Sequence, residues 1–386
     1  MGTLTRWRGH AEGARRCKRA GGVRGRICNA LTSPASARRL VTTRPTSPRR
    51  VPCFAMALLA VACGTTDRAL RPDVPTWTPG EPVLRVGVVE GDPAYQLHQV
   101  RDATLLPDGR LVIVNAGSHE VRIYAPDGSH LVSFGGEGEG PDDLIRPRAV
   151  LAEGDSLYVD SYGRVSTWTT DGELLRTEPA EPGYAAAWLE GGRRALARSE
   201  TVIPDVEGGI ARHPFTVHVG SDTLARYPGT QFVRAPSERG ILLRAFHFFA
   251  QPQMDAHGER VYAASGEERV VDVFQADGTR LDPIRWEGPS LEIRPADRDT
   301  LEAGIPVAET FPALSDLHTA SDGSLWVREY DRPGDTPGRW LVFQGGELVE
   351  RVTLAERAEL LEAGAGYVVL LERDELDVER VAVYRR

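Results

Sequence analysis

Short apolar runs separated by tight turns recur along most of this chain. The stretch LPDGRLVIVNAGSHEVRIYAPDGSHLVSF (106–134) shows the pattern, because its runs LVIV, VRIY and LVSF are separated by turns and Asp-Gly occurs twice. Asp-Gly between apolar runs is a strong hairpin signal, since glycine reaches the positive φ angles that such turns require. We therefore expect a series of antiparallel strands with short connections.

The pattern recurs as six units. Runs with strand composition, each preceded by a turn, are LVIV (111–114), LYVD (157–160), ALAR (195–198), VYAA (261–264), LWVR (325–328) and YVVLL (367–371). Each run is followed by another, so one unit is a four-stranded meander that is too small to bury both faces of its sheet alone. Stacking the units around an axis buries these faces. The sequence therefore predicts an all-β fold, a six-bladed β-propeller of four-stranded antiparallel blades.

The two ends of the chain predict how the ring closes. The chain ends on two strands with no outer strand after them, while residues 82–90 (PVLRVGVVE) read as a lone strand before the first unit. Pairing this N-terminal strand with the last blade would complete that blade and close the propeller. A short helix is expected over residues 295–304, between the fourth and fifth blades, because Pro and acidic residues come first and Gly comes last.

Charge and cysteine content exclude several classes of function from the body of the chain. Thirteen of the 46 Lys and Arg residues, but only one of the 55 Asp and Glu residues, lie in residues 1–62. The remainder holds 33 basic and 54 acidic residues, which argues against nucleic-acid binding, since phosphate contacts need clustered positive charge. All four cysteines lie at or before Cys63, so the body has no disulfide, thiolate metal site or cysteine nucleophile.

The N-terminal part carries an export signal. Three arginines precede VPCFAMALLAVAC (51–63), a mostly apolar stretch that is too short to span a bilayer. Its end, LAVAC, resembles a bacterial lipobox, which implies cleavage before Cys63, lipidation of Cys63 and a place on the periplasmic side of the cell envelope. The alternative is an ordinary signal peptide. We expect a disordered or mis-annotated leader (1–40), a signal peptide (41–62), a lipid-anchored linker (63–80) and the propeller (81–386).

Part of the body resembles a known class of propeller. FGGEGEGPDDLIRPRAV (134–150) is similar to the joint between blades of NHL-repeat propellers. The segments at 309–335 and 373–386 resemble bacterial six-bladed propeller lipoproteins of unknown function. The resemblance covers roughly residues 79–386 and implies the fold. NHL propellers include a lyase that holds metal with several axial histidines, and no such set of histidines maps onto this sequence.

The candidate site is the mouth of the central channel, where the second strand of each unit ends and loops from every blade converge. Ligand-binding candidates at strand ends or near inner strands are Asn115, Arg148, Asp160, His247, His318, Arg328, Arg373 and Asp374. Two tryptophans at strand positions, Trp326 and Trp340, are interpreted instead as packing between blades.

Three interpretations of these polar residues stay open. Ca²⁺ or Mg²⁺ would need several carboxylate and amide oxygens, which Asn115, Asp160 and Asp374 supply, although the arginines of the set oppose an anionic cage. A small anionic ligand, such as a carboxylate or sugar acid, suits the three arginines as a fork. In the third interpretation, the charges pair with one another. We predict no obligatory cofactor.

Three functions follow from these features. The leading hypothesis is a monomeric, lipid-anchored envelope module that binds a small anionic ligand or an envelope protein and no nucleic acid. Enzymatic activity is less expected, because the sequence contains no GxSxG, HExxH, P-loop or CxxC motif. The alternative is a metal-dependent hydrolase, lactonase or lyase that uses the channel. A third hypothesis is a structural subunit that contacts another envelope protein through the insertion at 200–215.

Overall fold

The computed structural model describes residues 74–386 except Pro182, Tyr184, Arg239 and Thr300. The predicted leader, signal peptide and lipidation site at Cys63 lie outside these residues. Within the described part, the regular structure consists of β-strands and three short 3-10 helices. That part of the chain has no helix long and apolar enough to cross a membrane.

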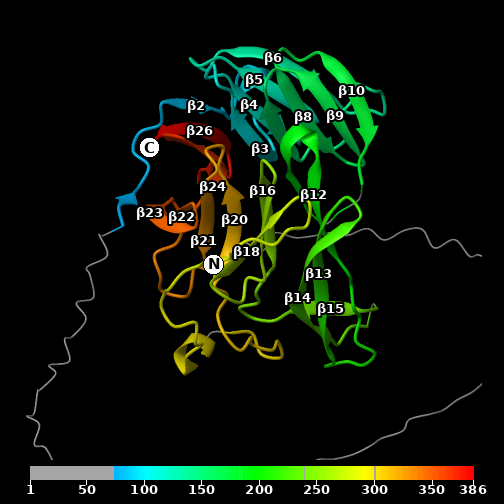
Figure 1. Ribbon diagram of the computed structural model, residues 1–386, viewed down its shortest axis with the longest axis vertical. Helices are drawn as coiled ribbons and strands as arrows, with labels where there is room; N and C mark the ends of the chain where they lie inside the picture. Colours follow the sequence, from blue (N-terminus) through cyan, green and yellow to red (C-terminus); the bar gives the residue numbers. More distant parts are fainter. Residues whose placement is uncertain (1–73, 182, 184, 239, 300) are drawn as a thin grey trace, which may run out of the picture. The chain divides into compact units, whose positions relative to one another are not determined.

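The strands form six sheets, one for each blade of a β-propeller (Figure 1). Blade 1 contains β3 (Val100–Leu105), β4 (Leu111–Asn115), β5 (Glu120–Tyr124) and β6 (His130–Gly135). Blade 2 contains β7 (Ala149–Glu153), β8 (Ser156–Ser161), β9 (Arg164–Thr169) and β10 (Leu174–Pro179). Blade 3 contains β11 (Ala185–Trp188), β12 (Arg194–Ser199), β13 (Ile210–Val219), β14 (Asp222–Ala235) and β15 (Leu242–Ala245).

The other three blades are also sheets of four or five strands. Blade 4 contains β16 (Gln253–His257), β17 (Arg260–Ala264), β18 (Val270–Gln275) and β19 (Ile284–Arg285). Blade 5 contains β20 (Leu314–Thr319), β21 (Leu325–Glu329), β22 (Arg339–Gln344), β23 (Glu347–Thr353) and β1 (Thr76–Trp77). Blade 6 contains β24 (Ala358–Gly364), β25 (Tyr367–Arg373), β26 (Glu379–Arg385) and β2 (Leu84–Val86). The predicted all-β propeller is confirmed, although blades 3 and 5 contain five strands where four were predicted.

The Asp-Gly turns form as the sequence predicts. Gly109 and Gly128 both have φ near 86°, a conformation that a side chain would strain. In each turn the preceding aspartate accepts a hydrogen bond from the backbone N–H two residues on, at 3.0 Å for Asp108 and 2.9 Å for Asp127. These local bonds reverse the chain within a few residues, which allows the strands to stay short.

An N-terminal strand closes the ring, as predicted. β2 pairs antiparallel with β26, with Leu84 opposite Val383 and Val86 opposite Val381. Figure 1 shows the two strands side by side, although they come from opposite ends of the described chain. The sixth sheet is therefore completed by residues that precede the first one.

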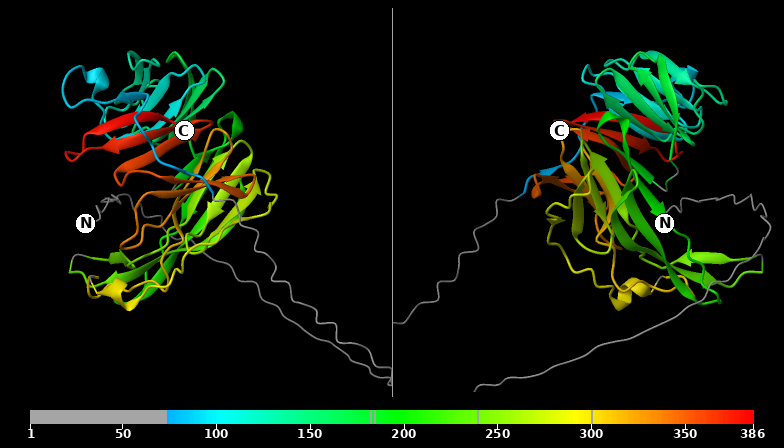
Figure 2. Two further views of the ribbon diagram at one scale, coloured as in Figure 1. Left: turned by 90° about the vertical axis from the view of Figure 1, so that its left-hand side faces the viewer. Right: turned by 45° about the vertical axis from the view of Figure 1, so that its right-hand side comes forward.

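Two segments differ from the prediction. β1 lies inside the predicted linker, where Thr76 and Trp77 pair in parallel with β23, so the propeller begins before residue 81. The helix expected over 295–304 is only the 3-10 helix η3 (Pro295–Arg298). Figure 2 shows this short helix in yellow. The residues after it contact the end of blade 3, where Arg244 pairs with Glu302 at 2.7 Å and the N–H of His247 donates to the carbonyl of Pro306 at 2.8 Å.

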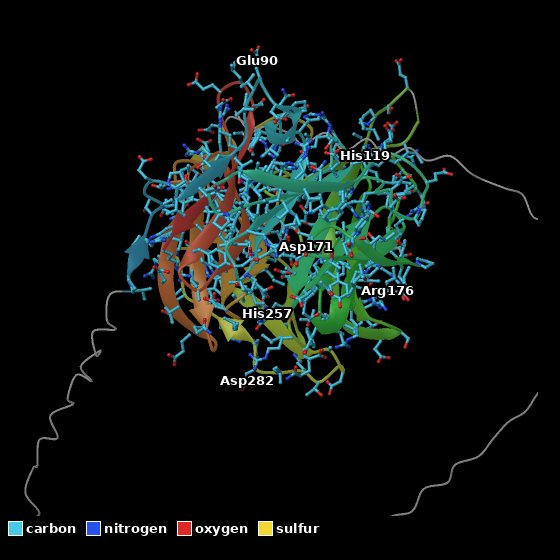
Figure 3. The ribbon with its side chains drawn as sticks, turned by 90° about the horizontal axis from the view of Figure 1, so that it is seen from above. Glu90, His119, Asp171, Arg176, His257 and Asp282 are labelled. Carbon is cyan, nitrogen blue, oxygen red and sulfur yellow. The ribbon has the colours of Figure 1, made fainter. Side chains whose placement is uncertain are left out.

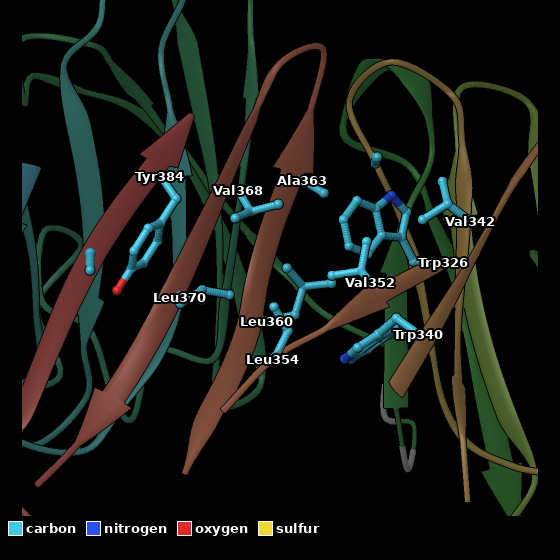
Figure 4. Close-up of a cluster of buried hydrophobic side chains, with 12 residues drawn as sticks. Trp326, Trp340, Val342, Val352, Leu354, Leu360, Ala363, Val368, Leu370 and Tyr384 are labelled. Atoms are coloured by element: carbon cyan, nitrogen blue, oxygen red, sulfur yellow. The ribbon is translucent and has the colours of Figure 1, made fainter. Parts of the chain in front are cut away.

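Apolar side chains between neighbouring blades form the core. One cluster joins blades 5 and 6 around Trp326 and Trp340, which are 0% and 2% exposed (Figure 4). This position confirms that both tryptophans pack between blades. Similar clusters join blades 6 and 1, 1 and 2, 3 and 4, and 4 and 5. Because blade 1 is covered by blade 6 on one face and by blade 2 on the other, its strand β4 is buried along its whole length.

The insertion in blade 3 exposes several apolar side chains. Within the predicted insertion (200–215) they are Val202, Ile203, Val206 and Ile210, and further ones between β14 and β16 are Ile241, Leu242 and Phe249. The role predicted for this insertion, contact with an envelope protein, stays a prediction.

We predict that the closing strand stabilises the whole ring. Val86 is 2% exposed, so Val86→Asp would bury a carboxylate in the cluster between blades 6 and 1 and cost roughly 3–5 kcal/mol of unfolding free energy. Val88 is 41% exposed, so Val88→Asp should change stability by about 0.5 kcal/mol or less. Urea unfolding followed by tryptophan fluorescence measures both, and equal effects of the two variants would contradict the closure.

Candidate functional site

The channel has two mouths, one where the inner strands begin and one where they end. The inner strands are β3, β7, β11, β16, β20 and β24, each of which is an edge strand of its sheet. Among them, β3 contacts β24 and β7, and β16 contacts β11 and β20. Seven of the eight predicted ligand-binding residues lie toward the first mouth or in the loops beside it, whereas His318 lies near the end of β20.

Asn115 holds the segment that leads into the first strand of blade 1. It is 1% exposed at the end of β4. Its Oδ1 accepts from the N–H of His98 at 2.8 Å, and its Nδ2 donates to Ser118 Oγ at 2.7 Å. Both ends of the amide are therefore occupied by the protein itself.

Asp160 joins blades 2 and 3. Its carboxylate accepts from Arg148 at 2.9 Å and from Arg194 of β12 at 3.3 Å, and the Asp160 and Arg194 side chains are 4% and 9% exposed. Burial raises the pKa of Asp160, while the two guanidinium groups oppose that rise. The rings of Tyr158 and Trp188 pack across the same joint, with centroids 6.3 Å apart.

The remaining charged candidates pair within their own blades. Arg328 donates to Asp331 at 3.1 Å, and Arg373 lies 3.3 Å from Glu359 and 3.2 Å from Glu379. Asp374 accepts from Arg380 at 2.9 Å. Together with the pair between Arg148 and Asp160, these contacts give each arginine of the predicted anion fork a carboxylate partner. Ligand binding by this set stays a prediction.

The two candidate histidines have different surroundings. His247 lies between blades 3 and 4, where its Nε2 is 3.2 Å from the carbonyl oxygen of Glu302. His318 lines the channel, and its buried Nε2 has no hydrogen-bond partner among the described residues. Burial lowers the pKa of His318 and so favours the neutral ring, while the nearby Asp255 acts in the opposite direction.

A cavity of about 530 Å³ occupies the channel and is lined by residues from the inner strands of all six blades. It reaches the second mouth, since Gly258 and Ser321, in the turns after β16 and β20, belong to its wall. His257, labelled in Figure 3, ends β16 at this mouth. Of the eight predicted residues, His318 alone is part of the wall. The volume is in the range of small-molecule sites.

Carboxylates on the inner strands bond to the next blade around the ring. An inner strand is a sheet edge, so some of its backbone N–H groups have no partner within the sheet. Asp102 accepts from the N–H of Val150 at 2.8 Å, and Asp255 accepts from the N–H of Thr319 at 2.6 Å. Glu362 accepts from the N–H of Leu105 at 2.6 Å across the junction of blades 6 and 1. These bonds link blade 1 to 2, 4 to 5 and 6 to 1.

The sequence analysis did not predict these inner-strand carboxylates, although a pattern in the sequence points to them. Three inner strands contain an aspartate, then Ala or Leu, then Thr or His: Asp102-Ala103-Thr104, Asp255-Ala256-His257 and Asp316-Leu317-His318. In each, the aspartate also accepts from the N–H of the following residue, at 2.9, 2.8 and 2.9 Å. A charged residue recurring on strands that line an axis would have indicated the channel wall.

Burial perturbs the titration of these carboxyl groups. It raises the pKa of Asp102 to about 8, although two backbone N–H donors favour the ionised form, and Glu362 and Asp255 raise it further. Burial also raises the pKa of Glu362 to about 7 and that of Asp316 to about 7. Within residues 74–386, no three His, Cys, Asp or Glu side chains are arranged to hold a metal ion.

Comparisons with known proteins give structural similarity only. No family model and no curated protein sequence matches the chain. A Bacteroides fragilis protein described as exported is 10% identical, with a TM-score of 0.45 over 81% of this chain and 99% of that one. A member of the DUF4221 family from Bacteroides vulgatus is 11% identical, with a TM-score of 0.45 over 80% and 98%.

A third similar structure is an inactive variant of virginiamycin B lyase from Staphylococcus aureus, solved with quinupristin. It is 10% identical, with a TM-score of 0.40 over 78% of this chain and 99% of that one. Similarities this distant assign neither an activity nor a ligand to this chain.

We predict that Asp160 is structural. Asp160→Ala leaves Arg194 buried without its partner, which should cost roughly 3–5 kcal/mol. The matched variant is Asp171→Ala, because Asp171 (Figure 3) is 84% exposed and pairs with Arg110 at the surface. That change should cost about 1 kcal/mol or less. Chemical denaturation of both variants compares the two costs, and a small loss for Asp160→Ala would show that the joint does not depend on the pair.

Thermal stability should fall as pH rises from about 5 to about 8.5. The unfolded chain has carboxyl pKa values near 4, whereas the folded chain holds Asp102 at about 8 and Glu362 at about 7. The folded state therefore binds more protons in this window, and raising the pH disfavours it. Calorimetry of Asp102→Asn and Glu362→Gln should give shallower slopes than the unmodified protein. Unchanged slopes in both would mean that these groups do not titrate there.

Proposed function

We propose that this chain is a binding module of the bacterial cell envelope that holds a small ligand in its central channel. The observation that carries the proposal is the cavity of about 530 Å³ to which all six inner strands contribute. Loops and strand ends from every blade surround such a site, so its shape depends on the complete ring. The lipobox-like sequence before Cys63 supports lipid anchoring, with the propeller on the periplasmic side.

Binding is favoured over catalysis by how the wall is built. The carboxylates of Asp102, Asp255 and Glu362 each accept backbone N–H bonds, which fix them in place. The alternative, a metal-dependent hydrolase, lactonase or lyase, would need a cluster of metal ligands. The described residues contain no such cluster. Conversion of a bound compound to product would support this alternative.

The channel can be tested by filling it. Ala186 lines the cavity and lies outside the apolar clusters, so Ala186→Phe should reduce the space while leaving the core intact. Ala355, exposed between blades 5 and 6, provides the control variant Ala355→Phe. Small amines, alcohols, sugars and carboxylates are screened by thermal shift. At a concentration about 100-fold above Kd, a ligand should raise Tm by about 5 °C in the wild type and the control.

The outcomes separate the functions. Loss of the Tm rise in Ala186→Phe, with the ligand recovered chemically unchanged by mass spectrometry, supports a binding module. A rise that persists in Ala186→Phe places the site outside the channel. Conversion of the compound to product would instead support the catalytic alternative.

A further inference from the structure

The described residues that line the channel cavity include acidic side chains but no lysine or arginine. Its titratable lining residues are Asp102, Glu153, Glu190, Asp255, His257, His318 and Glu362, without a lysine or arginine among them. Elsewhere on the propeller, many carboxylates are paired with arginines. Among the ion pairs of the described residues, none involves Asp102, Asp255 or Glu362.

These three carboxylates keep capacity to accept further hydrogen bonds. An ionised carboxylate offers about four acceptor positions. Asp102 uses two of them, for the N–H groups of Ala103 and Val150. Glu362 uses three, for the N–H of Leu105, the hydroxyl of Tyr367 and the side chain of Thr104. All three side chains are partly exposed to the channel, so a ligand in the cavity can reach them.

The carboxylates also act on one another. Glu362 and Asp255 both raise the pKa of Asp102, which is the effect of like charges placed close together. A cation between them would relieve this repulsion and favour the ionised forms. Binding of a cation would therefore release protons from the wall near neutral pH.

The shape of the cavity favours an organic cation over a metal ion. The acidic groups are spread around the wall rather than gathered into a set that fits a metal ion, within the part of the chain described. Apolar residues also line the cavity, among them Leu151, Ala186 and Trp188. The neutral ring of His318 also lines the cavity, and its buried Nε2 has no hydrogen-bond partner among the described residues.

We infer that the channel binds an organic ammonium ion: a protonated amine on a small aliphatic or aromatic body. The ammonium group donates to the carboxylates of Asp102 and Glu362, which lie on the adjoining blades 1 and 6, and Asp255 of blade 4 adds negative charge to the wall. The body of the ligand packs on the apolar part of the wall. This assignment rests on the proposed channel-binding function. The ammonium can belong to a free small amine or to the side chain of a lysine in a peptide.

Calorimetric titration with matched probes tests the charge requirement. Benzylamine and 1,6-diaminohexane are compared with benzyl alcohol and 1,6-hexanediol, which share their shape without the charge, and with the anion benzoate. The amines should bind at least about tenfold more tightly than the neutral and anionic probes. Nα-acetyl-lysine amide and a lysine-containing tetrapeptide form a further arm. Tighter binding of the tetrapeptide than of the free amines would identify a peptide as the source of the ammonium.

Variants then locate the charge. Asp102→Asn and Glu362→Gln should each weaken amine binding about tenfold, because each removes one charge-assisted contact. Asp155→Asn is the control, since Asp155 is exposed in the turn after β7 and is not part of the wall. A further measurement uses the unmodified protein, so a folding defect of a variant cannot affect it. Titrations in two buffers with different ionisation enthalpies should show proton release on amine binding near pH 7.

The results distinguish a failure of this inference from a failure of the channel proposal. If alcohols or benzoate bind, and Ala186→Phe abolishes their binding, while amines bind no better, the channel function stands and the cation assignment is overturned. Amine binding that is unaffected by Ala186→Phe and by both charge variants overturns both. Absence of binding by every probe class also contradicts both proposals.

Discussion

The ring depends on the junction between its first and last blades, because this is where a linear chain must be made circular. β2 completes the sixth sheet, and carboxylates of that blade reach across to blade 1. Glu379 accepts from the N–H of Val100 at 2.8 Å, and Glu362 accepts from the N–H of Leu105 at 2.6 Å. These contacts join residues more than 250 positions apart in the sequence. Bringing the two ends of the propeller together costs chain entropy, and these bonds and the pairing of β2 with β26 together offset that cost.

The segment between β2 and β3 reinforces the same junction. The guanidinium of Arg122, whose side chain is 7% exposed, donates to the carbonyl oxygens of Pro93 and Gln96, both at 2.9 Å. The hydroxyl of Tyr124 donates to the carbonyl of Ala94 at 2.6 Å. Blade 1 thus holds the chain that leads from the closing strand into its own inner strand.

The inner edge of the ring must supply acceptors for backbone N–H groups, and the proposed ligand site follows from this requirement. N–H groups at the edge of each inner strand need acceptors, and Asp102, Asp255 and Glu362 supply them to the neighbouring blade. Among the described residues, these three carboxylates around the axis have no arginine partner. A positive ligand would provide the missing countercharge, so the chemistry of the channel follows from how the blades are joined.

Sequence patterns predicted the fold more completely than the site. Turn dipeptides and apolar runs are local signals, so the strands of each blade and the closing role of residues 82–90 could be predicted. The partners of Arg328 and Arg373 could not, because those pairs depend on loop conformations that connect residues across turns. Asp102 and Asp255 were missed because their importance comes from neighbours in another blade. At 295–304, a Pro and early acidic residues suited a helix, yet only Pro295–Arg298 form a 3-10 helix, and the chain from Glu302 onward bonds to the end of blade 3.

A crystal structure of the protein with benzylamine would test the central claim, that the carboxylates joining the inner strands also form the ligand site. The account predicts the ammonium nitrogen within hydrogen-bond distance of at least one of Asp102, Asp255 and Glu362, with their bonds to the next blade retained. Benzylamine bound outside the channel, or these side chains turned away from it to pair with arginines, would contradict the account.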